Sequence, residues 1–295
     1  MQHEQRARIA GGRGFLAALD QSGGSTPKAL AEYGVPESAY PTEDAMFDLM
    51  HEFRSRIMTA PAFTSERILG AILFEQTMDR EVDGTATPQY LWERKGIVPF
   101  VKVDEGLAEE ADGVRLMKPF TRLGEVLERA GRRGVFGTKM RSFITRAEPA
   151  GVAAVLDQQF GYAGQILEAD LMPILEPEVD IHSDTKAAAE RLLRQGILER
   201  LAALPGDRQV MLKLSIPTED DGYAELIGHP KVLRVVALSG GYSRQDADAR
   251  LARNHGLIAS FSRALSEGLR YEQADDAFNR TLEDSIAEIF RASST

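Results

Sequence analysis

The chain has 295 residues, a length that suits one large domain or two ordinary ones. A hydrophobic fraction of 43% and a charged fraction of 27% are those of an ordinary globular protein, which excludes a disordered chain. The formal net charge of -10 is spread along the chain without a basic block, which argues against nucleic acid or an anionic membrane as a partner.

The sequence also restricts the compartment and the kind of chemistry. No apolar run approaches the ~18 residues of a membrane span, and the start, MQHEQRARIAGGRG, lacks the apolar stretch of a signal peptide. The chain contains no cysteine, so disulfides, thiolate metal ligands and cysteine nucleophiles are excluded. We therefore expect a cytoplasmic protein whose covalent chemistry uses another side chain.

Eight short apolar segments recur along the chain, with helical segments between them. We predict strands at 15–20, 68–74, 98–103, 135–141, 172–179, 210–216, 232–239 and 257–263. Near-continuous apolar runs of this length are typical of parallel strands that are buried on both faces. Strands that alternate with helices indicate an α/β fold with a parallel sheet.

Three of the intervening segments have a clear helical period. The first covers 43–58, the second begins after Ser183 as a predicted N-cap, and the third lies near 274–291 and is expected to pack across the sheet as an extra helix. No linker or composition break divides the chain. The prediction is therefore one domain over residues 1–295, a (β/α)8 TIM barrel with extra helices at the N- and C-terminal regions.

Ionisable residues gather at the carboxyl ends of the predicted strands. They are Asp20, Lys102, Lys139, Arg141, Glu176, Glu178 and Lys213. In a (β/α)8 barrel these ends meet on the active-site face. In VMLKLSI, Lys213 alternates with leucines, so it is predicted to point into the barrel while the leucines face the helices. A structural ion-pair network is the alternative for any one of them, but their common position favours a site.

A lysine among other lysines and carboxylates is typical of imine formation with a carbonyl substrate. The amine attacks only when unprotonated, and free lysine has a pKa of ~10.4, which burial and neighbouring cations lower. Lys213 is the predicted nucleophile on these grounds, with Lys139 as the neighbouring cation. Dehydration of the carbinolamine needs a proton donor, and Glu176 is the candidate for this general acid.

Small residues and one arginine follow the last two predicted strands. Ser239 and Gly240 begin an SGG sequence after the seventh strand, and Ser260 and Arg263 lie at the end of the eighth. Barrel enzymes commonly bind phosphate in these two loops, where glycine allows close backbone approach and a guanidinium takes phosphate bidentately. We therefore predict a phosphate site here, although an SGG sequence by itself is more often only a turn.

Eight motifs connect these observations to a known family. LAALDQSGGS, ILGAILFEQT, PFVKVDEG, GTKMRS, ILEPEVD, MLKLS, LSGG and SFSRAL occur in the order and spacing of class I fructose-bisphosphate aldolases, which the chain resembles from about residue 15 to about residue 265, with a likeness to the bacterial branch. The resemblance implies reversible cleavage of fructose 1,6-bisphosphate to dihydroxyacetone phosphate and glyceraldehyde 3-phosphate in glycolysis and gluconeogenesis. It implies a lysine Schiff base with no cofactor and no metal.

The resemblance also implies a role for each matching residue. Lys213 resembles the Schiff-base lysine, Glu176 the general acid/base, and Asp20 the aspartate near the C4 hydroxyl during cleavage. Lys139 and Lys102 match lysines that orient and polarise the substrate. The remaining matches are expected to bind substrate: Arg141 and Glu178 as accompanying site residues, Ser239, Gly240, Ser260 and Arg263 at the C1 phosphate, and Ser22 and Ser25 in the LAALDQSGGS motif.

The sequence departs from the animal members of the family in three places. Gln21 follows Asp20 where those members have glutamate, and Ala29 stands where they have an arginine associated with the C6 phosphate, so Lys28 or Ser25 is expected to take that contact. The chain ends in RASST, without the terminal tyrosine of the animal enzymes. The proton that the enamine needs must then come from Glu176 or from a tyrosine such as Tyr242 or Tyr271.

Three other functions are weighed against this prediction. A metal-dependent aldolase needs histidine ligands, but the five histidines form no HxxxH-type pair. A transaldolase-like or deoxyribose-phosphate-aldolase-like enzyme also uses a lysine, but two phosphate sites argue against both. A barrel that serves only as a binding protein is the rival outside enzymology, and an intact catalytic set argues against it. The oligomeric state stays open, a homo-oligomer included.

Overall fold

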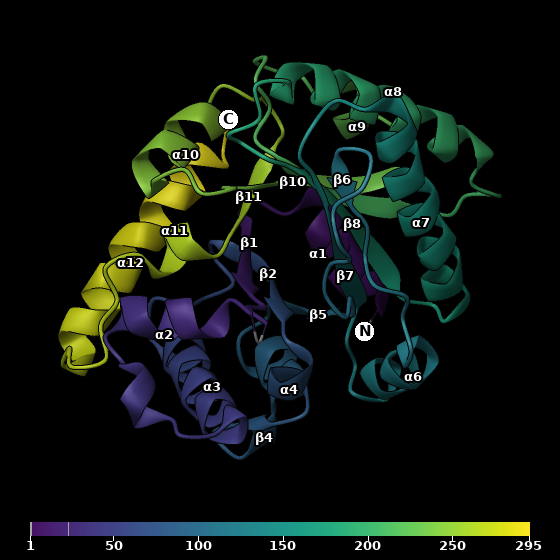
Figure 1. Ribbon diagram of the computed structural model, residues 1–295. Coiled ribbons are helices and arrows are strands. Elements are labelled where there is room, and N and C mark those ends of the chain that lie inside the picture. Colours follow the sequence, from purple (N-terminus) through teal and green to yellow (C-terminus); the bar gives the residue numbers. More distant parts are fainter. Residues whose placement is uncertain (1, 23) are drawn as a thin grey trace.

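The computed structural model describes residues 2–22 and 24–295, and within them eight parallel strands close into a barrel surrounded by helices (Figure 1). Each strand pairs with the next, and β11 returns to pair with β1. The barrel strands are β1 Phe15–Leu19, β2 Ile68–Leu73, β5 Val98–Lys102, β7 Gly137–Ile144, β8 Met172–Val179, β9 Val210–Ser215, β10 Val232–Leu238 and β11 Ile258–Phe261. The predicted barrel and its eight strands are confirmed.

Helices surround the barrel strands; α1 precedes the first strand, α11 and α12 follow the last, and the others lie between strands. They are α1 Gln2–Gly11, α2 Thr26–Tyr33, α3 Glu43–Thr59, α4 Glu75–Met78, α5 Thr87–Gln89, α6 Leu123–Arg132, α7 Pro149–Glu168, α8 Lys186–Ala203, α9 Ala224–Ile227, α10 Arg244–Leu251, α11 Arg263–Ser266 and α12 Asp275–Ala292. Two further helical turns are η1 Glu37–Ala39 and the π-helical η2 Tyr90–Arg94, and the remaining strands are β3 Glu81–Val82, β4 Thr85–Ala86 and β6 Val114–Arg115.

Strand alternation divides the apolar side chains into two clusters. One lies between strands and helices and includes Leu212 and Leu214, while the other fills the barrel interior and includes Met211 and Phe100. The predicted orientation of β9 is therefore correct. The interior is tightly filled: a Cβ at Gly137 would lie 2.2 Å from the Met172 carbonyl oxygen, so only glycine fits there.

Helix α1 lies at the centre of the ring of helices and contacts β2, β5 and β10 (Figure 1). Its Ile9 side chain joins the interior cluster, and Arg8 donates to the Ile68 carbonyl oxygen at 3.2 Å, at the amino end of β2. The helix therefore closes the amino ends of the strands. The carboxyl ends, where the charged residues lie, stay open to ligand.

Two local predictions are wrong. Helix α12 does not cross the barrel; it packs along its side against α10, α11 and β11, because its apolar face fits between these elements, and its Asn279 accepts a hydrogen bond from Ala62 N at 2.8 Å. Ser183 is not the N-cap of α8, which begins after Thr185. The loop turns first, with Ser183 N donating to Asp180 O at 3.2 Å, and Ser183 Oγ accepts from Thr185 N.

The C-terminal residues are fastened to the amino-terminal half of β11. Ser293 is buried, and its Oγ accepts a hydrogen bond from Ala259 N at 3.0 Å. Gly256 N donates to Thr295 O at 3.2 Å, just before β11 begins. Since β11 runs away from these contacts toward the open mouth, the tail lies at the end of the barrel opposite the charged residues.

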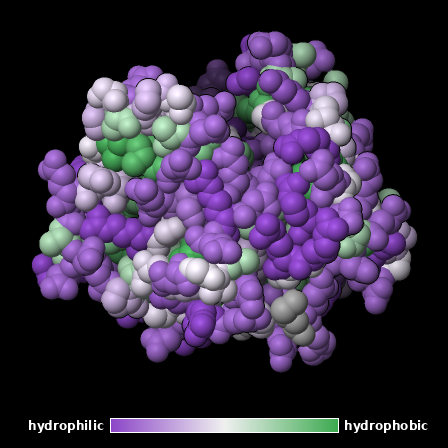
Figure 2. Space-filling model, turned by 90° about the horizontal axis from the view of Figure 1, so that it is seen from below, coloured by the Kyte–Doolittle hydropathy of each residue, from purple (hydrophilic) through white to green (hydrophobic). Residues whose placement is uncertain are grey.

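The surface is mainly hydrophilic on the face that Figure 2 shows. Among the described residues, Tyr271 is the one large hydrophobic side chain that is strongly exposed, at 53%. No helix in the described part of the chain is both long and apolar enough to cross a membrane.

Candidate active site

A cavity of about 580 Å³ opens at the carboxyl ends of the barrel strands. Every residue predicted for the site lines this one cavity: Asp20, Ser22, Ser25, Lys102, Lys139, Arg141, Glu176, Glu178, Lys213, Ser239, Gly240, Ser260 and Arg263. They come from segments that are far apart in the sequence and meet only because the eight strands close into a ring.

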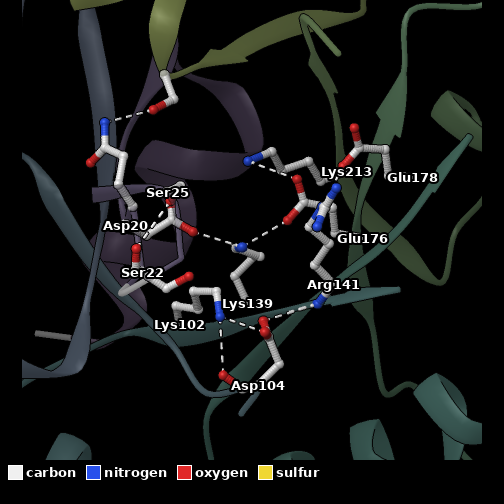
Figure 3. Close-up of polar contacts among 12 residues, drawn as sticks. Asp20, Ser22, Ser25, Lys102, Asp104, Lys139, Arg141, Glu176, Glu178 and Lys213 are labelled. Carbon is white, nitrogen blue, oxygen red and sulfur yellow. Dashed lines mark hydrogen bonds and ion pairs between the residues drawn. The ribbon is translucent and has the colours of Figure 1, made fainter. Parts of the chain in front are cut away.

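Four charged groups in the cavity, Asp20, Lys139, Glu176 and Lys213, are joined in this order by ion pairs, as Figure 3 shows. Lys139 Nζ lies 2.6 Å from Asp20 Oδ2 and 2.8 Å from Glu176 Oε2, so it stands between the two carboxylates. The other oxygen of Glu176 lies 3.0 Å from Lys213 Nζ. The side chains of Lys139, Glu176 and Lys213 are at most 5% exposed. Glu176 is therefore shared by two lysines.

Burial and ion pairing act in opposite directions on these groups. Burial alone would raise the pKa of Asp20 and Glu176, but the ammonium groups of Lys139 and Lys213 hold the pKa of both carboxyls below the usual range. Burial would lower the pKa of Lys139, but Asp20 and Glu176 raise it above its ordinary value. Lys139 thus remains an ammonium ion, and both carboxylates are ionised at neutral pH.

Asp104 is a member of this cluster that the sequence prediction missed. It accepts from Lys102 Nζ, and its second carboxylate oxygen accepts from Arg141 N at 3.1 Å (Figure 3). Burial lowers the pKa of Lys102 despite this contact. The signal was present in the sequence, because Asp104 lies two residues after Lys102 and alternation places both on the same side.

A second missed residue, Arg54 on α3, stands behind the end of β1. Its guanidinium donates to Thr77 Oγ1 at 2.8 Å and to the backbone oxygen of Gln21 at 2.6 Å. Burial lowers the pKa of Arg54 to about 9, so it stays charged at neutral pH. The Gln21 amide in turn donates to Ser262 Oγ at 2.8 Å, which ties the end of β1 to the end of β11. Gln21 therefore has a structural role beside Asp20, since both its side chain and its backbone oxygen are hydrogen-bonded to other elements.

The predicted phosphate-binding residues meet on one side of the mouth. Gly240 has φ +61°, and a Cβ there would lie 2.6 Å from Ile181 Cγ2, so glycine is required. At Gly241 the nearest part of Arg263 is its Nη2, 3.6 Å from where a Cβ would stand. Ser260 Oγ is buried and has no hydrogen-bond partner among the described residues. Arginine, backbone amides and a free hydroxyl together suit an anion.

Neither Tyr242 nor Tyr271 is among the residues that line the cavity. Tyr242 lies under the guanidinium of Arg250, and Tyr271 packs edge-on against Tyr33 near the surface. Of the proton donors considered from the sequence, Glu176 is the one that the cavity contains. Within residues 2–22 and 24–295, no group of three or more histidine, aspartate and glutamate side chains is placed to hold a metal ion.

A closed (β/α)8 barrel whose mouth holds four lysines and five carboxylates is an arrangement that suits enzymes of the imine-forming type. Comparisons with known proteins give the family. The family model Glycolytic, described as fructose-bisphosphate aldolase class-I, matches residues 2–215. The chain belongs to the class I fructose-bisphosphate aldolase family, whose members are lyases.

Curated relatives belong to the same family, and a solved structure shares the fold. The fructose-bisphosphate aldolase class 1 of Synechocystis sp. is 58% identical over 292 residues, which are 99% of this chain and 97% of the relative. That of Clostridium acetobutylicum is 55% identical over 295 residues, the full length of both. The fructose-bisphosphate aldolase of Plasmodium falciparum, solved with TRAP and a small-molecule inhibitor, has a TM-score of 0.73 at 18% identity, covering 99% and 94% of the two chains, which shows the common fold.

Proposed function

We propose that this chain cleaves fructose 1,6-bisphosphate to dihydroxyacetone phosphate and glyceraldehyde 3-phosphate through an imine on Lys213. One observation carries the choice of lysine. Lys139 is held by two carboxylates, and Lys102 by the carboxylate and backbone oxygen of Asp104. Lys213 contacts only Glu176 among the described carboxylates, and it shares Glu176 with Lys139. Lys213 is therefore the least strongly held of the three lysines, and we propose it as the nucleophile.

Imine formation follows from this pair. Glu176 takes a proton from Lys213, which leaves a neutral amine and a neutral carboxylic acid 3.0 Å apart. The amine attacks C2 of the ketose to form the carbinolamine. Glu176 then returns a proton to the departing hydroxyl, which leaves as water, and the imine carries the positive charge. Lys139 keeps its proton throughout and holds the anionic carboxylates in place.

Cleavage needs a base on the other side of the cavity. Asp20 lies across Lys139 from Glu176 and is proposed to remove the proton of the C4 hydroxyl, so that the C3–C4 electron pair moves to the imine and glyceraldehyde 3-phosphate leaves. The remaining enamine takes a proton at C3. We propose that the proton which Asp20 took from the C4 hydroxyl passes through a water molecule to Glu176, an anion after the dehydration step, and that Glu176 then delivers it to C3. Hydrolysis of the imine releases dihydroxyacetone phosphate and restores the Lys213 amine.

The proposal also covers phosphate binding, the need for a cofactor, the domain organisation and the cellular location. We propose that Ser239, Gly240, Ser260 and Arg263 bind the C1 phosphate, and that the reaction uses no cofactor besides the imine. Residues 1–295 are proposed to form one domain, since α1 and α12 both pack on the barrel. The net charge of -10 argues against nucleic acid or an anionic membrane as a partner. We propose a cytoplasmic enzyme whose partner is a phosphorylated sugar.

Borohydride trapping tests the nucleophile. Reduction in the presence of dihydroxyacetone phosphate is expected to inactivate the enzyme and to add one reduced triose phosphate to the peptide that contains Lys213, because reduction turns the reversible imine into a stable secondary amine. Peptide mass spectrometry locates the label, and borohydride without the triose phosphate is the control. A label on Lys139 or Lys102, or no label, would refute the assignment.

Treatment with EDTA is expected to leave activity unchanged.

The C-terminal tail is expected to affect stability and not catalysis. Removing residues 292–295 should leave cleavage and enamine protonation within about twofold, because the tail lies at the closed end of the barrel. It should lower the free energy of unfolding by roughly 1–3 kcal/mol, since Ala259 N loses a buried acceptor. Proton exchange of dihydroxyacetone phosphate by NMR and urea unfolding measure the two effects. Ser293→Ala should reproduce the loss of stability, and slow proton exchange after truncation would contradict this placement.

A further inference from the structure

Two arginines that line the cavity have no carboxylate partner. Of Arg115, Arg141 and Arg263, Arg141 is paired with Glu178, whereas Arg115 and Arg263 form no ion pair within the described part of the chain. A guanidinium that lines a cavity and has no carboxylate partner can bind an anionic group of a ligand. Arg263 is accounted for by the C1 phosphate, and Arg115 has no assigned role.

The strand order puts these two arginines on opposite sides of the mouth. Arg263 follows β11, and Arg115 belongs to β6, which pairs antiparallel with β7 through Arg115 and Phe143. In the closed ring, three strands separate β11 from β7 in either direction. A ligand held at Arg263 and bound covalently at Lys213 therefore extends toward the side from which Arg115 enters the cavity.

The hairpin that carries Arg115 holds its side chain in place. Asp112 and Gly113 both have positive φ, as a two-residue hairpin turn requires, and they reverse the chain so that Val114 pairs with Ala111 and Met117 with Leu107. The returning segment, which includes β6, also pairs antiparallel with β7. Arg115 Nε donates to the Ala108 carbonyl oxygen across the hairpin at 2.9 Å. The two terminal nitrogens of the guanidinium have no partner in the described residues, and they are the pair that takes phosphate bidentately.

We propose, on the basis of the proposed function, that Arg115 binds the phosphate on C6 and sets the preference for a bisphosphate over a ketose 1-phosphate. The two residues expected from the sequence to take this contact fit less well. Lys28 is strongly exposed and lies 4.0 Å from Glu32, and the Ser25 hydroxyl donates to the Ser22 backbone oxygen. Arg115 replaces, from another side of the cavity, the arginine that is absent at Ala29.

Steady-state kinetics on two substrates tests the assignment. Arg115→Gln is expected to lower kcat/KM for fructose 1,6-bisphosphate by about 10- to 100-fold, the loss of a hydrogen-bonded charge, and to change kcat/KM for fructose 1-phosphate by less than about twofold. Arg115→Lys should lie between wild type and Arg115→Gln for the bisphosphate, since it keeps the charge and loses the bidentate contact.

Arg263→Gln is the matched variant, because the C1 phosphate is common to both substrates and both values should fall by a similar factor. An equal fall on both substrates with Arg115→Gln, or an unchanged value for the bisphosphate, would overturn the proposal. If Arg115→Gln does not fold, Arg115→Lys decides by the same comparison. Borohydride trapping with dihydroxyacetone phosphate distinguishes a failure of this proposal from a failure of the proposed function, because this triose phosphate has no C6 phosphate. A label on Lys213 in wild type and in Arg115→Lys upholds the proposed function, whatever the ratio of kcat/KM for the two ketose substrates.

Discussion

Lys213→Arg is expected to lower the rate of carbon–carbon cleavage by roughly four to six orders of magnitude, the range for removal of a covalent nucleophile. A guanidinium stays protonated and cannot form the imine, yet it keeps the positive charge beside Glu176. The free energy of unfolding should therefore change little. A coupled assay for glyceraldehyde 3-phosphate measures the rate, and urea unfolding measures the stability.

The same variant gives a second test of the covalent step. Borohydride with dihydroxyacetone phosphate should no longer label the protein, whereas the matched variant Lys118→Arg, away from the cavity lining, should be labelled as wild type. Cleavage by Lys213→Arg within about a hundredfold of wild type, a far smaller loss than a lost covalent nucleophile gives, would mean that another lysine forms the imine.

Lys139→Met is expected to destabilise the protein by about 3–5 kcal/mol at neutral pH, the cost of leaving buried charges without their partner. Lys139 is the cation between Asp20 and Glu176, at 2.6 and 2.8 Å, and its removal leaves two buried carboxylates with less compensation. Lys213→Met is the matched control. The Lys213→Met substitution should lower the free energy of unfolding clearly less than Lys139→Met does, because Glu176 keeps its contact with Lys139. Equal losses in the two variants would refute this central role of Lys139.

A fall in pH should change the free energy of unfolding of wild type and of Lys139→Met in opposite directions. In wild type the pKa of Asp20 and Glu176 is lowered, so their contribution to stability is present above the ordinary carboxyl pKa of about 4 and is lost as pH falls through the lowered values. Without Lys139 the nearest cation is lost, so burial is expected to raise the Asp20 pKa and the folded state is expected to gain protons on acidification. Urea unfolding at about pH 7 and about pH 5 should show the difference between the two proteins narrowing at the lower pH.

Much of the site was determined by the sequence itself. A period of two along a buried strand leaves only two directions for a side chain, so the pattern in β9 places Lys213 inside the barrel. Parallel strands in a closed ring end at the same face, which brings Asp20, Lys139 and Glu176 together once the strands are recognised. The pairing of the SGG loop with Arg263 follows in the same way, because β10 and β11 are adjacent.

Only the tertiary structure decided which charge lies against which. That Lys139 is held by two carboxylates and Lys213 by one depends on distances of a few ångströms between side chains from four strands, which no local pattern encodes. The place of Arg115 depends on a hairpin folding back onto β7, and the place of α12 on the gap between its neighbours. Local periodicity restricts the direction of each side chain, while contacts between distant segments arise only when the closed barrel fixes their separation.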